Sequence, residues 1–366
     1  MKNQIIKLVF ALTLAFTAFS CNNDGNNDEI VKLPTIVDIA KSNPDLSILV
    51  VALTKTGLAT TFTSSGSYTV FAPTNAAFTA AGISEASISA MTAPQLAGLK
   101  LILQNHVLGV GTKAIDLLPN AALGITGYSR TFGYYKAKTT DTTGANLSMF
   151  VNQVGADVLV NGGSTNGGSK VINADIEASN GIIHTIGNIL VLPTIVSQVK
   201  ANPDLFSTLL TVLSGTSTVP GLYGNQSAIL TGLTNALGES NTTSISLFAP
   251  TNAAFAKATA SGGFLTNSTF FGTPALTATN IANVLKYHYQ SGNFPSFNAT
   301  SYSAATATND QLVTTALGQS IKILKYTVKV IEQPVINLPA SNMKVVNIQG
   351  TNGVIFAMDR VLQPVL

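Results

Sequence analysis

The stretch Phe71-Ala72-Pro73-Thr74-Asn75-Ala76-Ala77-Phe78 occurs a second time, unchanged, as Phe248–Phe255. The apolar residues that lead into the two copies, Tyr68–Ala72 and Ile245–Ala249, predict buried strands. In both copies the Pro-Thr-Asn that follows ends the strand and offers a side-chain cap to a helix. The two copies are offset by 177 residues (248 − 71), so the repeat indicates duplication of a whole domain and not a solenoid of short units.

Three further landmarks recur in the same order. Each pair is given with the first copy before the second: Thr35–Leu46 with Thr194–Leu205, His106 with His288, and Asn180–His184 with Asn352–Phe356. The first pair is offset by 159 residues (194 − 35), so the second copy has 18 additional residues (177 − 159) before its Phe248. These fall in the Gly-, Ser- and Asn-rich segment Thr216–Thr243, which is either a tolerated insertion or a candidate binding loop.

Each copy is predicted to be helical in its first half and stranded in its second. The apolar spacing predicts a helix at Ile36–Ala40 that Asn43-Pro44 ends, and further helices at Ser47–Thr54 and Phe206–Leu213. Leu96, Leu99, Leu103 and Val107 share one helical face, as do Ile281, Val284, Leu285 and His288. Strands are predicted at Leu147–Val151, Val158–Asn161, Lys170–Ala174 and Ile182–Leu192. This order predicts the α+β class.

The N-terminus predicts export. Lys2 and Lys7 precede an apolar run that is too short to span a bilayer, so residues 1–20 are interpreted as a signal peptide. Cys21, the only cysteine, follows Ser20 as in the bacterial lipobox, where the thiol is lipidated; a cleaved signal with a free thiol is the alternative. The polar residues 21–33 are predicted to be a disordered tether. The arrangement resembles surface lipoproteins of Bacteroidetes and predicts a lipid-anchored protein at the outer membrane or cell surface.

Composition and motifs argue against several function classes. Removing Lys2 and Lys7 lowers the 19 basic residues to 17 against 16 acidic ones, which leaves no basic surplus for nucleic acid. Three histidines and one cysteine give no metal-ligand spacing, and no Gly-x-Ser-x-Gly elbow is present. The Gly-rich run Gly162–Lys170 lacks the ending of a phosphate loop and is predicted to be a mobile hairpin. No cofactor is expected.

Two weaker signals remain. In strand register Asp175 and Glu177 share a face, which would suit a glycosidase pair or a weak calcium site, although a solvated strand face is favoured. Asp141-Thr142-Thr143 resembles the three-residue pattern whose hydroxyl side chain Bacteroidetes glycosylate in exported proteins. The modified residue here would be Thr142.

The landmarks together resemble the fasciclin (FAS1) domain. Its first block resembles Tyr68–Phe78 and Ser244–Phe255, its Tyr-His motif falls on Tyr287-His288, and its closing block resembles Asn180–Pro193 and Asn352–Pro364. The resemblance implies two FAS1-like domains at 34–193 and 194–366, each a wedge-shaped β-sandwich flanked by helices. Such domains are used in extracellular adhesion and matrix proteins, and no disulfide is available to stabilise them here.

The two copies depart from the family pattern in different places. Asn105 replaces the motif tyrosine in the first copy, Phe356 replaces His184 in the second, and Asp359 matches Gly187. The candidate interaction or structural residues are Tyr287, His288, His106, His184 and Asp359. A structural role for the tyrosine and histidine is favoured over receptor binding. Because it keeps the Tyr-His pair, the second copy is the favoured binder.

The sequence favours a non-catalytic adhesion or interaction lipoprotein that binds a protein, a matrix component or a glycan, with the membrane contacted through the anchor alone. The alternative is a polysaccharide-binding accessory of an outer-membrane nutrient-uptake system. Its stacking platforms would come from the aromatic residues Tyr134, Tyr135, Tyr287, Tyr289, Phe294, Phe297 and Tyr302. An enzymatic role for Asp175 and Glu177 is a third, weaker hypothesis.

Overall fold

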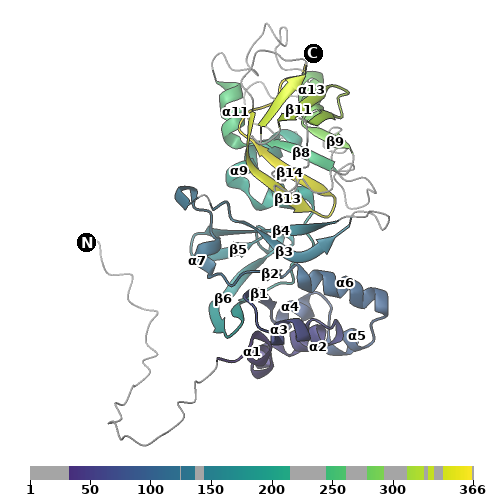
Figure 1. The fold of residues 1–366 in the computed structure, drawn as a ribbon, viewed down its shortest axis with the longest axis vertical. Helices are drawn as coiled ribbons and strands as arrows, with labels where there is room; N and C mark the ends of the chain where they lie inside the picture. The colour runs from purple at the N-terminus through teal and green to yellow at the C-terminus, as the bar shows by residue number, and fades with distance from the viewer. Residues whose placement is uncertain are drawn as a thin grey trace, which may run out of the picture. The chain divides into compact units, whose positions relative to one another are not determined.

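The computed structural model describes residues 33–123, 125–136, 144–214, 245–260, 278–291, 311–324, 329–333 and 341–364. We call Ile36–Ile186 the N-terminal module and Ile195–Met358 the C-terminal module, because their elements follow the same order (Figure 1). Several predictions lie outside the described residues: Cys21 and its flanking segment, Thr142, the Thr216–Thr243 segment, and the aromatics Phe294, Phe297 and Tyr302.

The N-terminal module begins with helices and ends with strands. Its helices are α1 (Ile36–Ser42), η1 (Pro44–Leu46), α2 (Ser47–Lys55), α3 (Ala59–Thr63), α4 (Asn75–Ala80), α5 (Glu85–Ser89), α6 (Ala93–Gln104), α7 (Ala114–Leu117), η2 (Ala121–Leu123) and η3 (Ser164–Asn166). Its strands are β1 (Tyr68–Pro73), β2 (Val107–Leu108), β3 (Tyr128–Tyr135), β4 (Ala145–Val154), β5 (Asp157–Val160), β6 (Ser169–Ala178) and β7 (Gly181–Ile186). Helices α1 to α6 gather beside β1 (Figure 1), so the predicted α+β class is confirmed.

Local signals explain where the first elements begin and end. The Thr35 side chain accepts a hydrogen bond from the Asp38 backbone N–H, and the Asp38 carboxylate accepts one from the Thr35 N–H, which together form a capping box for α1. Helix α1 ends at Ser42, before Asn43-Pro44, as predicted. Thr74 caps α4 in the same way, by accepting from the Ala77 N–H.

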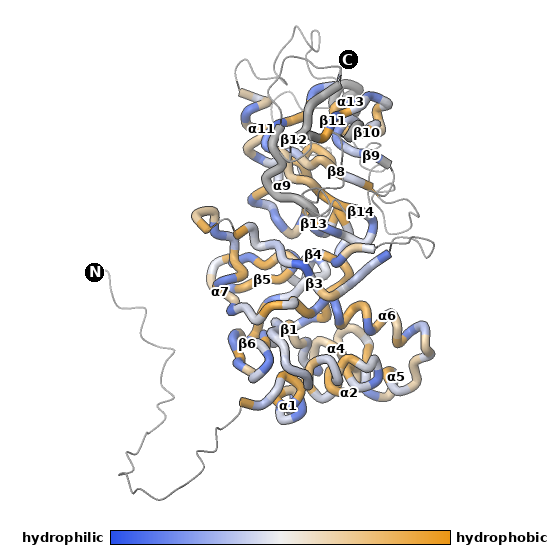
Figure 2. The backbone as a smooth tube through the Cα atoms, in the orientation of Figure 1, coloured by the Kyte–Doolittle hydropathy of each residue, from blue (hydrophilic) through white to orange (hydrophobic). Residues whose placement is uncertain are grey.

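The seven strands of the N-terminal module close into a barrel, in the order β1 to β7. Closure comes from parallel pairing of β1 with β7, which places Phe71 opposite His184 and Pro73 opposite Ile186. The predicted strand Ile182–Leu192 is therefore wrong at its C-terminal end. Strand β7 ends at Ile186, the point where β1 leaves the sheet at Pro73 to enter α4 and parallel pairing with β1 stops. Hydrophobic residues occur along both the helices and the strands of this module (Figure 2).

The C-terminal module repeats this order. Its described helices are α8 (Ile195–Ala201), α9 (Pro203–Ser214), α11 (Asn252–Thr259) and α13 (Ala278–Tyr287). Its described strands are β8 (Ile245–Pro250), β9 (Tyr289–Ser291), β10 (Gln311–Thr314), β11 (Ser320–Leu324), β12 (Lys329–Gln333), β13 (Ser341–Gly350) and β14 (Gly353–Met358). They form one sheet in the order β10-β11-β12-β13-β14-β8-β9, with β8 and β14 parallel.

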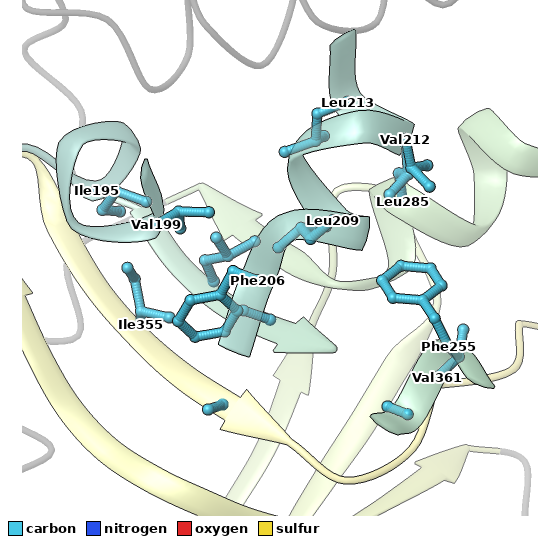
Figure 3. Packing of buried hydrophobic residues seen from close by; sticks show 14 of the residues in the cluster. Ile195, Val199, Phe206, Leu209, Val212, Leu213, Phe255, Leu285, Ile355 and Val361 are labelled. Carbon is cyan, nitrogen blue, oxygen red and sulfur yellow. The ribbon is translucent and has the colours of Figure 1, made fainter. Parts of the chain in front are cut away.

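The core of the C-terminal module lies between its helices and its sheet. Phe206 and Leu209 of α9 pack with Ile355 of β14, and Phe255 of α11 lies beside Val361 (Figure 3). Phe206 and Ile355 have no exposed surface. Among the described residues, no helix combines the length and the apolar character needed to cross a bilayer.

The strand-ending threonines give a first prediction. Thr74→Ala removes the α4 cap and is expected to lower the free energy of unfolding by about 1 kcal/mol. Urea denaturation measures the change in the free energy of unfolding. The matched control is Thr79→Ala on the exposed side of α4, which removes only a hydroxyl bonded to the Asn75 carbonyl and is expected to stay within about 0.5 kcal/mol of the wild type. Equal losses in the two variants would show that the cap contributes nothing.

Candidate functional site

The asparagine of the repeated Pro-Thr-Asn block is bonded inside each module. In the N-terminal module Asn75 Nδ2 donates to the Pro44 carbonyl (2.9 Å), and its Oδ1 accepts from the Ile48 N–H (3.0 Å). Asn252 makes the equivalent bonds to the Pro203 carbonyl (3.0 Å) and the Thr208 N–H (2.9 Å). In both modules the side chain joins two helices and is occupied by them.

The Asn-Gly of the closing block connects the last strand to the first helix. Asn180 Oδ1 accepts from the Ile36 N–H at the start of α1 (2.9 Å), and Asn352 Oδ1 accepts from the Ile195 N–H at the start of α8 (2.8 Å). The glycine that follows has a positive φ, +152° at Gly181. A Cβ there would lie 2.1 Å from the Tyr68 carbonyl oxygen, so the close approach of β1 and β7 requires glycine.

The two equivalent histidines make the same pair of bonds. His106 Nδ1 lies 2.7 Å from the Ile102 carbonyl oxygen, and its Nε2 accepts from the Leu190 N–H at 2.9 Å. His288 lies 2.6 Å from the Val284 oxygen and accepts from the Leu362 N–H at 2.8 Å. A ring nitrogen that accepts an N–H carries no proton, so both imidazoles are assigned as neutral, with the proton on Nδ1.

Burial explains why these histidines stay neutral. Desolvation lowers the pKa of His106 to about 4, against the smaller opposing effect of its bond to the Ile102 carbonyl. The pKa of His288 is also lowered to about 4, again mainly by burial. With exposed fractions of 2% and 1%, neither ring is accessible to a ligand or a receptor.

Tyr287 is also buried, with no exposed surface, and its hydroxyl donates to the Ser320 carbonyl at 2.9 Å. Its counterpart Asn105 is equally buried and accepts from the Thr131 hydroxyl at 3.2 Å. The Tyr-His pair therefore provides no surface for a partner, and it does not support the preference for the second copy as the binder.

His184 and Phe356 occupy equivalent positions on β7 and β14. His184 faces Phe71 at a ring-centroid distance of 5.2 Å, whereas Phe356 stacks on Phe248 at 5.4 Å. His184 Nδ1 accepts from the Asp175 N–H (3.1 Å), and its Nε2 lies 3.2 Å from the Thr112 oxygen. Burial lowers the pKa of His184, partly offset by that carbonyl and by the Asp175 carboxylate.

Asp359, the remaining candidate residue, directly follows β14 and is half-buried. The three histidines lie in separate positions, and each is bonded within its own module. The three histidines therefore do not form one site.

The two strand carboxylates have separate partners. Asp175 has a φ of +61° beside an irregularity in the β6–β7 pairing, and its Oδ1 accepts from the Ala114 N–H at 2.8 Å. Glu177 forms an exposed ion pair with Lys113 at 3.2 Å. Among the described residues no group of three His, Cys, Asp or Glu side chains could hold a metal ion. The two carboxylates are thus joined to Lys113, which precedes α7, and to Ala114, which begins it.

The described surface offers large apolar side chains instead. Ile115 on α7 is 67% exposed and Ile172 on β6 is 61% exposed. The bond from the Ala114 N–H to Asp175 ties the start of α7 to β6, so these two isoleucines lie on neighbouring elements. The sequence did not predict this feature. Ile172 alternates with the buried Val171 along β6, so an apolar residue lies on the exposed face of the strand.

Comparison with known proteins shows similarity to the fasciclin domain in both modules. The fasciclin domain model matches residues 44–193 and 225–364. The chain is 30% identical over 156 residues to transforming growth factor-beta-induced protein ig-h3 of Sus scrofa; the match covers 43% of this chain and 19% of that protein. It is 31% identical over 160 residues to the uncharacterized protein sll1735 of Synechocystis, covering 44% of this chain and 99% of that one.

A solved FAS1 domain pair from the insect cell adhesion molecule fasciclin I aligns with 89% of this chain and 100% of its own, at a TM-score of 0.48 and 14% identity. The family match carries the assignment, since its two segments together cover well over half of the chain. The chain therefore belongs to the fasciclin family and contains two fasciclin domains in tandem.

Proposed function

We propose that the protein is an exported, non-catalytic interaction protein of the cell surface that binds a protein, a matrix component or a glycan through its fasciclin domains. One observation carries the proposal: the repeated Asn, Gly and His residues and Tyr287 are occupied by bonds or close packing inside the modules, while large apolar side chains remain exposed. Buried motif residues that stabilise a fold leave the surface free to evolve for binding.

The arrangement proposed for the chain has four parts. Residues 1–20 are the signal peptide and 21–33 the tether, with Cys21 as the lipidated residue. The two domains span 34–193 and 194–366. The anchor follows from the sequence pattern around Cys21, and the membrane is contacted through it alone.

The polysaccharide-binding alternative finds less support. Tyr287, one of its stacking platforms, is buried with no exposed surface. Tyr134 is 49% exposed, and Tyr135 and Tyr289 are half-buried. Partly exposed tyrosines do not favour a sugar-binding role over protein binding, because apolar and aromatic side chains contribute to both kinds of interface.

The test is a binding screen with an array of matrix proteins and glycans. The variant Ile115→Asp/Ile172→Asp is expected to lose about tenfold or more in affinity for the ligand found, because it puts two charges into the exposed apolar surface. Lys55→Asp, on the exposed end of α2, is the matched control and is expected to bind as the wild type does. Unchanged binding by the double variant would exclude this surface, and an array with no ligand of any class would contradict the proposed function.

A further inference from the structure

The junction between the two modules buries polar side chains. Gln198 lies in the middle of α8, yet it is only 1% exposed, and its Nε2 donates to the Ser148 carbonyl of β4. The Ser148 hydroxyl in turn accepts from the Gln349 backbone N–H of β13 at 2.9 Å. One residue of the N-terminal module is therefore bonded by two different elements of the C-terminal module.

The Gly-rich turn that was predicted to be a mobile hairpin takes part in the same junction. It does connect two strands, β5 and β6, as predicted, but it is held by contacts with α8. Asn166 Nδ2 donates to the Ser197 carbonyl at 2.8 Å. Gly162 has a φ of +77°, and a Cβ on it would lie 2.9 Å from the Ala201 Cα, so the helix lies directly against the turn.

An aromatic side chain crosses the junction as well. Tyr128 of β3 packs against the hydrophobic core cluster of the C-terminal module, and its ring lies 4.7 Å from that of Phe150. Its hydroxyl is 3.5 Å from the Gln198 carbonyl oxygen. Apolar packing and directional hydrogen bonds therefore act at the same place.

Helix α1 provides an internal comparison, because it is the counterpart of α8 in the N-terminal module. The equivalent of the buried Ala201 is Ser42, which is exposed, and the equivalent of the half-buried Ser197 is the exposed Asp38. The burial of α8 on this side therefore comes from contact with the other module and not from packing inside its own.

The connecting segment is fixed along its length. The Leu190 N–H donates to His106, and the Val191 N–H donates to the Gly167 carbonyl at 2.8 Å. Further along, the Pro193 carbonyl accepts from the Thr351 N–H at 2.7 Å. These bonds leave no free linker between the modules, unlike the flexible connections that are usual between domains.

We infer that the two fasciclin modules form one rigid pair, locked in a single orientation by the α8 junction. Rotation at the junction would break the bond from Gln198 Nε2 to the Ser148 carbonyl and the bond from the Gln349 N–H to the Ser148 hydroxyl, which is unfavourable for buried polar groups. The rigid pair presents both module surfaces at a fixed spacing. A partner that contacts both modules would then bind without the entropy loss of ordering them.

The test measures the distance between the modules in the full chain. Cys21→Ser removes the only native cysteine, and spin labels are attached through Lys100→Cys on α6 and Lys257→Cys on α11, both exposed. Pulsed dipolar spectroscopy is expected to give one narrow distance distribution. Ala201→Arg, which forces a long charged side chain against the Gly162 turn, is expected to broaden it at least twofold. Ser42→Arg, at the equivalent position of α1, is expected to leave it unchanged.

A broad distribution in the unmodified junction would overturn the inference, whatever the variants do. So would a folded Ala201→Arg protein, checked by circular dichroism, whose distribution stays narrow. Asn166→Ala is the milder second variant, since it removes the bond to the Ser197 carbonyl without a steric clash. It is expected to broaden the distribution less than Ala201→Arg, and no broadening by either variant would contradict the assigned contacts.

Discussion

Gly181→Ala is expected to destabilise the N-terminal module by about 4 kcal/mol, as overpacking and an unfavourable backbone each contribute about 1–3 kcal/mol. The added Cβ would lie 2.1 Å from the Tyr68 carbonyl oxygen and 2.8 Å from its nitrogen. Both atoms belong to the backbone of β1, so no side chain can move aside. The φ of +152° adds strain for any residue with a side chain.

The same substitution elsewhere in the module provides the control. Gly98 lies within α6, where an added Cβ meets nothing within 4 Å. Alanine favours a helix over glycine by up to about 1 kcal/mol, so Gly98→Ala is expected to raise the stability. Thermal unfolding followed by circular dichroism compares the two variants. Gly181→Ala is expected to lower the Tm by about 10 °C, and a change of less than about 2 °C would show that β1 and β7 separate easily.

The elements that could be predicted from the sequence are those with local causes. Helix α1 begins at a threonine cap and ends before Asn43-Pro44, and both signals lie within a few residues of each other. Strand β1 was predicted from its continuous apolar run, which matches its burial on both sides. Such signals act within the segment itself, so tertiary contacts strengthen them and do not overrule them.

The features that could not be predicted depend on contacts between distant segments. The end of β7 at Ile186 is decided by where β1 leaves the sheet, more than 100 residues earlier. Gln198 is a polar residue and the turn at Gly162 is rich in glycine, so the sequence alone predicts exposure for both. In the structure each is covered by the other module. A single sequence read alone carries no signal for such an interface.

The candidate residues show the same division. The sequence identified the repeated histidines and favoured a structural role for them, and their bonding partners, Ile102 and Val284, lie one helical turn before each ring. Their second partners, Leu190 and Leu362, are 84 and 74 residues away in the chain. Only the structure reveals that the rings join each helix end to the segment that closes the module.

Those rings lead to the second large effect, a loss of stability in mild acid. Each histidine has a folded-state pKa of about 4, below the value near 6.5 in the unfolded chain. Between these two values the unfolded state binds more protons than the folded state, so the stability decreases as the pH falls through this window and is fully present above it. Between about pH 7.5 and about pH 5, each histidine is expected to remove about 2 kcal/mol from the free energy of unfolding of its module.

Urea denaturation at a series of pH values measures this effect, and stopping at about pH 5 keeps most carboxylates ionised. His106→Gln/His288→Gln provides the control, because glutamine does not titrate and can still donate and accept hydrogen bonds. The double variant is expected to be less stable at neutral pH but to show a much flatter dependence on pH, with the slope that remains assigned to His184. An equally steep slope in the double variant would show that other groups cause the acid sensitivity. If the stability of the wild type did not change with pH, the two rings would have to accept protons without breaking their bonds to the Leu190 and Leu362 N–H groups. That result would contradict the assignment of the proton to Nδ1 in each ring.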